Sequence, residues 1–307
     1  MRFIARRPGG RKTSGLPPAC ADFTALITGA SSGIGLEFAR ALAARGHNLT
    51  LVARREDRLR AVADELSQAH DVQVDWLSVD LGDPQQRDRL QASVLERGLP
   101  VQVLVNCAGF GIYEPFAVSP RSHELEQVKL LVEAVVDLDA RFLPGMVRRD
   151  RGAIVNVAST AGFQPLPSNG TYSACKAFVL AHSEAIAEEL RDTGVMVTAV
   201  CPGPVPTEFF DISGSLGMNR IPRIFWCTAP RVARDGLNAV ERGAPSVVPG
   251  APFVRAFYAP YRTAPRFIAA PIARWLMAGE LERTRSLPME PELEFGRPAG
   301  TRSGGEL

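Results

Sequence analysis

The sequence predicts one α/β domain, a doubly wound parallel sheet of about seven strands with helices on both faces. Between residues 22 and 250, short apolar runs alternate with longer amphipathic stretches. That alternation indicates βαβ units, whose right-handed crossovers produce a parallel sheet covered on each side. The short runs are apolar almost throughout, as expected for strands covered on both faces. No linker-like segment interrupts this region, so we expect a single domain.

The strands are predicted from apolar, β-branched runs that end near Gly, Asn or Asp. They cover 23–30, 48–54, 72–80, 101–109, 152–160, 195–203 and, as a seventh, 245–250. The helices are predicted from apolar residues at helical spacing. They cover 33–46, 56–70, a segment between the third and fourth strands, 123–147 and 172–192. We expect 123–147 to form one long helix.

The two ends of the chain differ from this pattern. Residues 1–21 are basic and broken by Pro-Gly-Gly, which predicts a disordered extension, with a transit peptide as the alternative. Residues 280–307 are polar with Pro and Gly and are also predicted to be disordered. Between them, 251–279 interleaves aromatic residues with Arg and has no acidic residue. This segment is either a cap over a pocket, a subunit contact or an interfacial membrane segment.

Composition excludes several classes of function. A net charge of +2 predicts no nucleic-acid partner. The five cysteines are odd in number and lack CxxC or metal-site spacing, and no secretory signal is visible. We therefore expect a cytoplasmic protein without a metal site, with membrane association through 251–279 left open. No apolar run reaches the roughly 18–20 residues that cross a bilayer.

A glycine-rich loop, TGASSGIG at 28–35, lies between the first predicted strand and the first helix. Gly29, Gly33 and Gly35 allow a tight turn and a close approach of the backbone to a pyrophosphate at the helix N-terminus. A plain Gly-rich turn is the alternative. The position of the loop in the first βα turn favours a dinucleotide site.

The second strand ends without a carboxylate. Folds that bind NAD usually carry Asp or Glu there, which binds the ribose 2′-hydroxyl. Here Ala53 is followed by Arg54 and Arg55. Guanidinium groups bind phosphate through charge-assisted, bidentate hydrogen bonds. We therefore expect NADP rather than NAD, with Arg54 and Ser31 near the 2′-phosphate, although a solvated Arg pair stays open as an alternative.

Tyr172 and Lys176 lie four residues apart in a predicted helix and so share a face. The chain has 32 Arg but three Lys, so Lys176 is not a default basic residue. Ser159 ends the fifth strand, at the sheet edge where ligands bind. Reduction of a ketone by hydride leaves an alkoxide that needs a proton, which a tyrosine with a lowered pKa can donate. An ammonium stabilises the tyrosinate, and a serine hydroxyl stabilises the developing oxyanion. We expect Ser159, Tyr172 and Lys176 to be catalytic.

These motifs resemble the short-chain dehydrogenase/reductase superfamily, within it a little-characterised bacterial branch. The resemblance runs over about 23–250 and includes the glycine loop, Asn-Cys-Ala-Gly at 106–109, Tyr-Ser-Ala-Cys-Lys at 172–176 and Pro202-Gly203. It implies a Rossmann-type fold, a nicotinamide cofactor and a dimer or tetramer. It also implies that Asp80 touches adenine, that Asn106 lines the cofactor cleft and that Thr207 holds the nicotinamide carboxamide. The complete predicted cofactor-binding set is Gly29, Ser31, Ser32, Gly33, Ile34, Gly35, Arg54, Asp80, Asn106, Ala108, Gly109, Tyr172, Lys176, Pro202, Gly203, Val205 and Thr207.

One departure from the family pattern lies in the long helix. Leu131 stands where most active members carry a catalytic Asn, which in the family helps to hold a helix kink whose carbonyl binds a lysine-linked water. Either the carbonyl alone sustains the proton relay, or the proton path is rewired and turnover is poor. A second departure, Cys107 in place of an Asn, is mild because small residues fit there.

The apolar segment 204–227 follows Pro202-Gly203. It either packs on the body of the protein or lines a hydrophobic substrate pocket. We expect an NADP-dependent oxidoreductase acting on a hydrophobic, lipid-like ketone or secondary alcohol. The alternative is a dinucleotide-binding sensor or interaction protein whose catalysis is weakened by Leu131.

Overall fold

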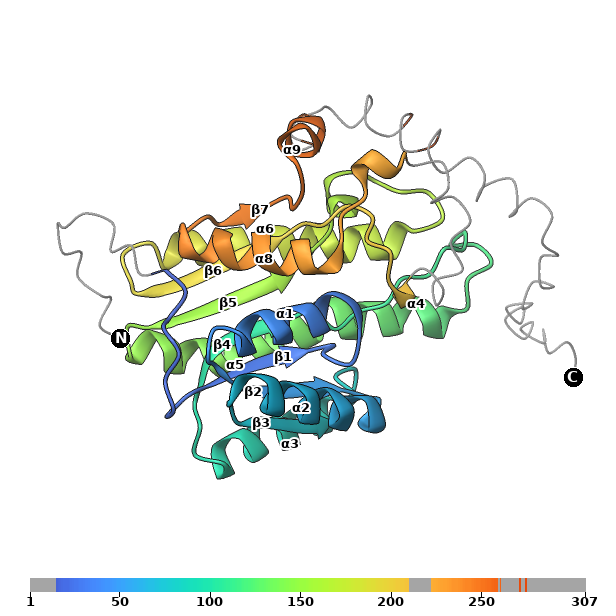
Figure 1. The fold of residues 1–307 in the computed structure, drawn as a ribbon. Coiled ribbons are helices and arrows are strands. Elements are labelled where there is room, and N and C mark those ends of the chain that lie inside the picture. Colours follow the sequence, from blue (N-terminus) through green and yellow to red (C-terminus); the bar gives the residue numbers. More distant parts are fainter. Residues whose placement is uncertain (1–14, 210–221, 259, 261–270, 272–273, 275–307) are drawn as a thin grey trace, which may run out of the picture.

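A computed structural model describes residues 15–209 and 222–258, together with residues 260, 271 and 274. Its centre is a seven-stranded parallel sheet in the order β3-β2-β1-β4-β5-β6-β7 (Figure 1). The strands are β1 (Thr24–Thr28), β2 (Asn48–Ala53), β3 (Val74–Ser78), β4 (Val101–Asn106), β5 (Gly152–Val157), β6 (Val195–Val200) and β7 (Ser246–Val247). The predicted doubly wound sheet is confirmed.

Helices cover both faces of this sheet (Figure 1). They are α1 (Gly33–Ala43), α2 (Glu56–His70), α3 (Pro84–Glu96), α4 (Arg121–Val128), α5 (Ala134–Arg148), α6 (Gly170–Glu189), α8 (Ala229–Glu241) and α9 (Pro252–Tyr258). The hydrophobic core on one face joins the sheet to α1, α2 and α8, and the core on the other joins it to α3, α5 and α6. Short 3₁₀ turns lie at Thr160–Phe163 (η2) and Arg223–Phe225 (η4).

The strand β1 shows why its sequence is apolar without alternation. Ala25 and Ile27 belong to the core under α1, α2 and α8, whereas Leu26 belongs to the core on the opposite face. Every residue of the strand is buried. Successive side chains point to opposite faces, so a strand covered twice needs apolar residues at odd and even positions.

The helix predicted as one piece at 123–147 is continuous but not regular. A π-helical turn, η1 (Lys129–Glu133), joins α4 to α5, and the Ala134 amide donates to the Lys129 carbonyl five residues earlier. Leu131 lies in this turn. The predicted long helix is thus continuous but contains a π turn that packs against α6, and π turns of this kind often occur at functional sites.

The N-terminal segment begins to pack earlier than predicted. Leu16 lies against the core under α1, and the Pro18 carbonyl accepts a hydrogen bond of 3.1 Å from the Arg151 guanidinium. The disordered extension predicted for 1–21 is thus wrong for 15–21, because these residues are fixed by contacts with the body. Residues 1–14, the predicted tail 280–307 and most of 251–279 lie outside the described residues. No helix in the part of the chain that the structure describes combines the length and apolar character needed to span a bilayer.

Candidate active site

A cleft of about 570 Å³ opens at the carboxyl ends of the strands. It lies where β1 is flanked by β2 on one side and β4 on the other, so the crossover connections leave the sheet in opposite directions. Ligands of open parallel sheets bind at such switch points. Every predicted site residue except Asn106 lines this one cleft.

The glycine loop forms the floor of the cleft beneath α1. Gly29 and Gly33 have φ values of +67° and +58°, which side-chain-bearing residues rarely adopt. A Cβ on Gly35 would lie 2.4 Å from the Gly29 carbonyl oxygen, so only glycine permits this contact between helix and loop. The first turn of α1 therefore presents its amides to the cleft, as an anion-binding helix N-terminus does.

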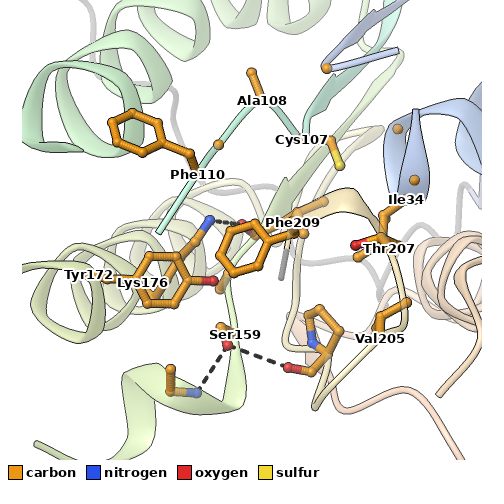
Figure 2. Close-up of a pocket in the computed structure, with 18 of the residues that line it drawn as sticks. Ile34, Cys107, Ala108, Phe110, Ser159, Tyr172, Lys176, Val205, Thr207 and Phe209 are labelled. Atoms are coloured by element: carbon orange, nitrogen blue, oxygen red, sulfur yellow. Dashed lines mark hydrogen bonds between the residues drawn. The ribbon is translucent and has the colours of Figure 1, made fainter. Parts of the chain in front are cut away.

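The loop after β4 is tied to the end of β1. The Thr28 hydroxyl accepts hydrogen bonds from the Cys107 and Ala108 amides at 2.9 and 3.0 Å. Cys107 lies beside Ala108 at the edge of the cleft (Figure 2). Burial raises the pKa of the Cys107 thiol to about 12, so it remains a neutral thiol and fills space at this position.

Arg55 contacts the glycine loop, whereas Arg54 was the predicted phosphate ligand. The Arg55 guanidinium donates to the Ser31 hydroxyl at 3.0 Å and to the Ser32 hydroxyl at 2.7 Å. Arg54 is exposed and also lines the cleft, and its role stays a prediction. The structure thus brings a guanidinium and two hydroxyls together beside the end of β2, at one end of the cleft.

Ser159, Tyr172 and Lys176 meet at the other end (Figure 2). Ser159 accepts a hydrogen bond from the Ala161 amide at 3.1 Å, which fixes its hydroxyl at the start of η2. Lys176 Nζ lies 5.7 Å from the centre of the Tyr172 ring and donates to the Val157 carbonyl at 2.7 Å. Tyr172 and Lys176 are 8% and 7% exposed, so α6 holds both inside the protein.

The pKa of Tyr172 is raised, whereas a lowered one is expected from the sequence. Burial raises the pKa of Tyr172, and its hydrogen bond with Ser159 offsets only part of that rise. Burial likewise lowers the pKa of Lys176. The largest cause of each shift is desolvation, because burial disfavours the charged form of both side chains. The tyrosine therefore carries its proton at neutral pH, but burial makes it a weaker acid than a free tyrosine.

Leu131 packs directly behind this pair. It is 1% exposed and shares an apolar cluster with Tyr172 and Cys175. A Cβ on Gly109 would lie 2.9 Å from Leu131 Cδ2 and 3.9 Å from Lys176 Nζ, so both side chains lie beside Gly109. The π turn consequently forms without an amide side chain at this position.

Asn106 does not line the cleft, which corrects the prediction made for it. Its side-chain amide donates to Asp139 at 2.9 Å and to Asn156 at 2.8 Å, inside the protein. Asn156 in turn donates to Asp139 at 2.9 Å and to Ser183 at 3.0 Å. This buried network joins β4, β5, α5 and α6. It positions the strand ends that carry the cleft.

The space beside Tyr172 is walled by apolar and aromatic side chains. Phe209 lies against Tyr172 with ring centres 5.6 Å apart (Figure 2). Farther out, the ring centres of Phe225 and Phe257 are 4.5 Å apart, and those of Phe257 and Tyr258 are 5.2 Å apart. Among the described residues of 251–279, Phe257 and Tyr258 line the cleft, and the role of the segment stays a prediction. A sequence reading alone could not assign α9 to this wall, because its aromatic residues fit a membrane surface equally well.

Comparison with known proteins defines the class and then the family. A glycine loop at the switch point of a doubly wound sheet is typical of nucleotide-binding α/β proteins. A family model described as short chain dehydrogenase matches residues 23–214. The chain belongs to this family, which confirms the superfamily predicted from its motifs.

Curated relatives carry a narrower name. The chain is 38% identical over 217 residues to a very-long-chain 3-oxoacyl-CoA reductase of Phaeosphaeria nodorum, a match that covers 69% of this chain and 64% of that protein. It is 36% identical over 192 residues to the protein of that name from Bos taurus, covering 61% of each. The chain therefore spans a little under two thirds of the length of these two relatives. These relatives are fungal and animal and do not mark the bacterial branch that we expected.

A solved structure supports membership in the short-chain dehydrogenase family. A short-chain dehydrogenase from Sphingobium yanoikuyae in complex with NADPH aligns with a TM-score of 0.70 and 28% identity. The alignment covers 89% of this chain and 99% of that one.

Proposed function

We propose that the protein is an NADPH-dependent oxidoreductase that reduces the ketone of a hydrophobic, 3-oxoacyl-type substrate. One observation carries this proposal: the glycine loop, the arginine at the end of β2 and the Ser159–Tyr172–Lys176 group line a single cleft whose far wall is aromatic.

The residues present fit a phosphorylated dinucleotide. Gly29, Gly33 and Gly35 leave the cradle that a pyrophosphate needs, since a Cβ at any of them would strain the backbone or meet a neighbour. Arg55, with Ser31 and Ser32, is placed to hold a 2′-phosphate through charge-assisted bonds. When bound, the nicotinamide supplies the hydride.

The protein's own residues handle the substrate oxygen and its proton. Ser159 accepts from the Ala161 amide and makes only a long hydrogen bond of 3.5 Å to the Pro202 carbonyl, so its hydroxyl proton can instead be donated to a substrate carbonyl oxygen and stabilise developing negative charge. Tyr172 is a neutral phenol at neutral pH and donates the proton that the alkoxide needs. Lys176 is anchored at the Val157 carbonyl and has further N–H groups for ribose hydroxyls and for the tyrosine oxygen.

The substrate class rests on the aromatic wall and on the relatives. Phe209, Phe225, Phe257 and Tyr258 give the outer cleft an apolar lining suited to an acyl chain. Relatives at 36–38% identity are named very-long-chain 3-oxoacyl-CoA reductases. A cytoplasmic location, peripheral membrane contact near α9 and a dimeric or tetrameric state are further proposals.

A dinucleotide-binding sensor with weak turnover is the second candidate. It is favoured by Leu131, an apolar side chain where the family's amide is expected, packed with Tyr172. This protein would bind NADPH but would show no Tyr172-dependent reduction.

Purified protein would be mixed with NADPH and a series of 3-oxoacyl thioesters and simpler ketones, and cofactor oxidation followed by absorbance. We expect turnover that increases with chain length and falls at least about a hundredfold in Tyr172→Phe, within the range of acid–base contributions. Retained turnover in Tyr172→Phe would overturn the assigned proton donor. NADPH binding without turnover on the whole panel would favour the sensor.

A further inference from the structure

The carboxylate of Glu208 binds Arg55, the arginine beside the proposed phosphate site, on its solvent side. Glu208 Oε2 accepts from Arg55 Nη1 at 2.7 Å, and Glu208 Oε1 accepts from Arg58 Nη1 at 2.5 Å. The opposite edge of Arg55 bonds Ser31 and Ser32. Arg55 is therefore held between the glycine loop and Glu208.

This arrangement has the chemistry of a phosphate site. One anion with two oxygens bridges two guanidinium groups, as a phosphate would. The pair of arginines also holds the pKa of Glu208 near 2, so the carboxylate is ionised at neutral pH. The side chains of Arg55, Arg58 and Glu208 are 40%, 49% and 41% exposed, so a ligand from solvent can reach them.

We propose that Glu208 is a specificity-determining residue of the cofactor site, because its carboxylate competes with the 2′-phosphate of NADP for Arg55 and Arg58. The inference rests on the proposed NADPH-dependent function. It assigns Arg58, outside the predicted site, as a second phosphate ligand. NADH lacks the 2′-phosphate and does not compete for these two arginines.

The competition also connects the phosphate end of the cleft to the catalytic end. Glu208 is flanked by Thr207, whose methyl group lies 3.3 Å from a Cβ built on Gly33, and by Phe209, which packs on Tyr172. Exchange of the carboxylate for phosphate releases the ion pairs that anchor this short stretch to α2. We therefore expect the release of Glu208 to change the position of the Phe209 ring that packs on Tyr172.

The test is a fluorescence titration of the full-length protein with NADPH and with NADH. Glu208→Gln keeps the shape of the side chain and removes its charge. We expect it to lower the Kd for NADPH about three- to tenfold and to leave the Kd for NADH within about twofold, since two exposed ion pairs no longer compete. In a triple variant that also carries Arg55→Gln and Arg58→Gln, the Kd for NADPH should no longer be lowered.

Glu65→Gln is the matched control. Glu65 forms an exposed pair with Arg40 at 2.9 Å, away from the cleft, and its loss should change neither Kd. An unchanged or higher Kd for NADPH in Glu208→Gln, with tight binding by the wild type, would overturn this inference alone. An equal decrease in the Kd for NADPH and the Kd for NADH in Glu208→Gln would also overturn it. Failure of the wild type to bind NADPH would overturn the proposed function and this inference with it.

Discussion

Leu131→Asn restores the amide that the family carries in its long helix, and its effect can be estimated from the structure. Leu131 is 1% exposed and packs on Tyr172 and Cys175. Loss of the buried leucine costs about 2–3 kcal/mol, and an amide left without a partner there costs about 1–3 kcal/mol more. We therefore expect the free energy of unfolding to fall by about 3–6 kcal/mol.

The same substitution should do little for catalysis. The π turn already forms with leucine at this position, so the amide is not needed to create the irregular backbone beside Lys176. We expect kcat to stay within about threefold of the wild type, a change of under 1 kcal/mol in barrier. Urea unfolding followed by tryptophan fluorescence would report stability, and NADPH oxidation would report kcat.

Leu131→Met is the control, because an apolar swap of similar volume usually costs less than about 1.5 kcal/mol. If Leu131→Asn were as stable as the wild type, the amide would have found a partner that the structure does not indicate. A tenfold rise in kcat would show that the missing amide limits turnover. Either result would refute the reasoning.

Three other substitutions test separate parts of the structure. Arg55→Gln should raise the Kd for NADPH about 10- to 100-fold and leave the Kd for NADH nearly unchanged, because charge-assisted bonds to a 2′-phosphate are lost. An equal rise in both Kd values, measured by fluorescence titration, would contradict that role. Arg87→Met should lower the free energy of unfolding by about 3 kcal/mol in urea, because the Arg87 side chain is 3% exposed and bonds Asp137 at 2.5 Å. Burial lowers the pKa of His47 from an ordinary 6.5 to about 4, so protonation favours the unfolded chain and stability falls as pH drops through that interval. Between pH 7 and pH 4 the His47 contribution should lower the free energy of unfolding of the wild type by about 2–3 kcal/mol. Unfolding of His47→Gln at the same two pH values should show a fall that is smaller by most of this amount.

Features that depend on local pattern could be predicted from the sequence. The strands and most helices follow from apolar periodicity, and the glycine loop from its place between β1 and α1. Ser159, Tyr172 and Lys176 can be proposed from the sequence because the chain so rarely uses lysine and because strand ends meet at one edge of a parallel sheet. The structure brings them to the cleft at one end, as that reasoning expected.

Features that depend on side-chain direction or on distant contacts could not be predicted in this way. Arg54 and Arg55 are adjacent, and only the fold decides which of them reaches Ser31. Asn106 ends β4 like a cleft residue, but the buried Asp139 on α5 takes its amide. Glu208 lies 153 residues from Arg55 in the sequence, and no local pattern relates them. The π turn at Leu131 has a helical composition, so its register could be seen only in the backbone.

Hydride transfer itself tests the central claim most directly. NADPH carrying deuterium at the transferable position would be incubated with a long-chain 3-oxoacyl thioester and either wild-type protein or Tyr172→Phe, and the product examined by mass spectrometry. The proposed function predicts a 3-hydroxy product that carries the deuterium on its new carbinol carbon with the wild type and almost none with Tyr172→Phe. An unlabelled product, or no product from a wild-type protein that binds NADPH tightly, would contradict it.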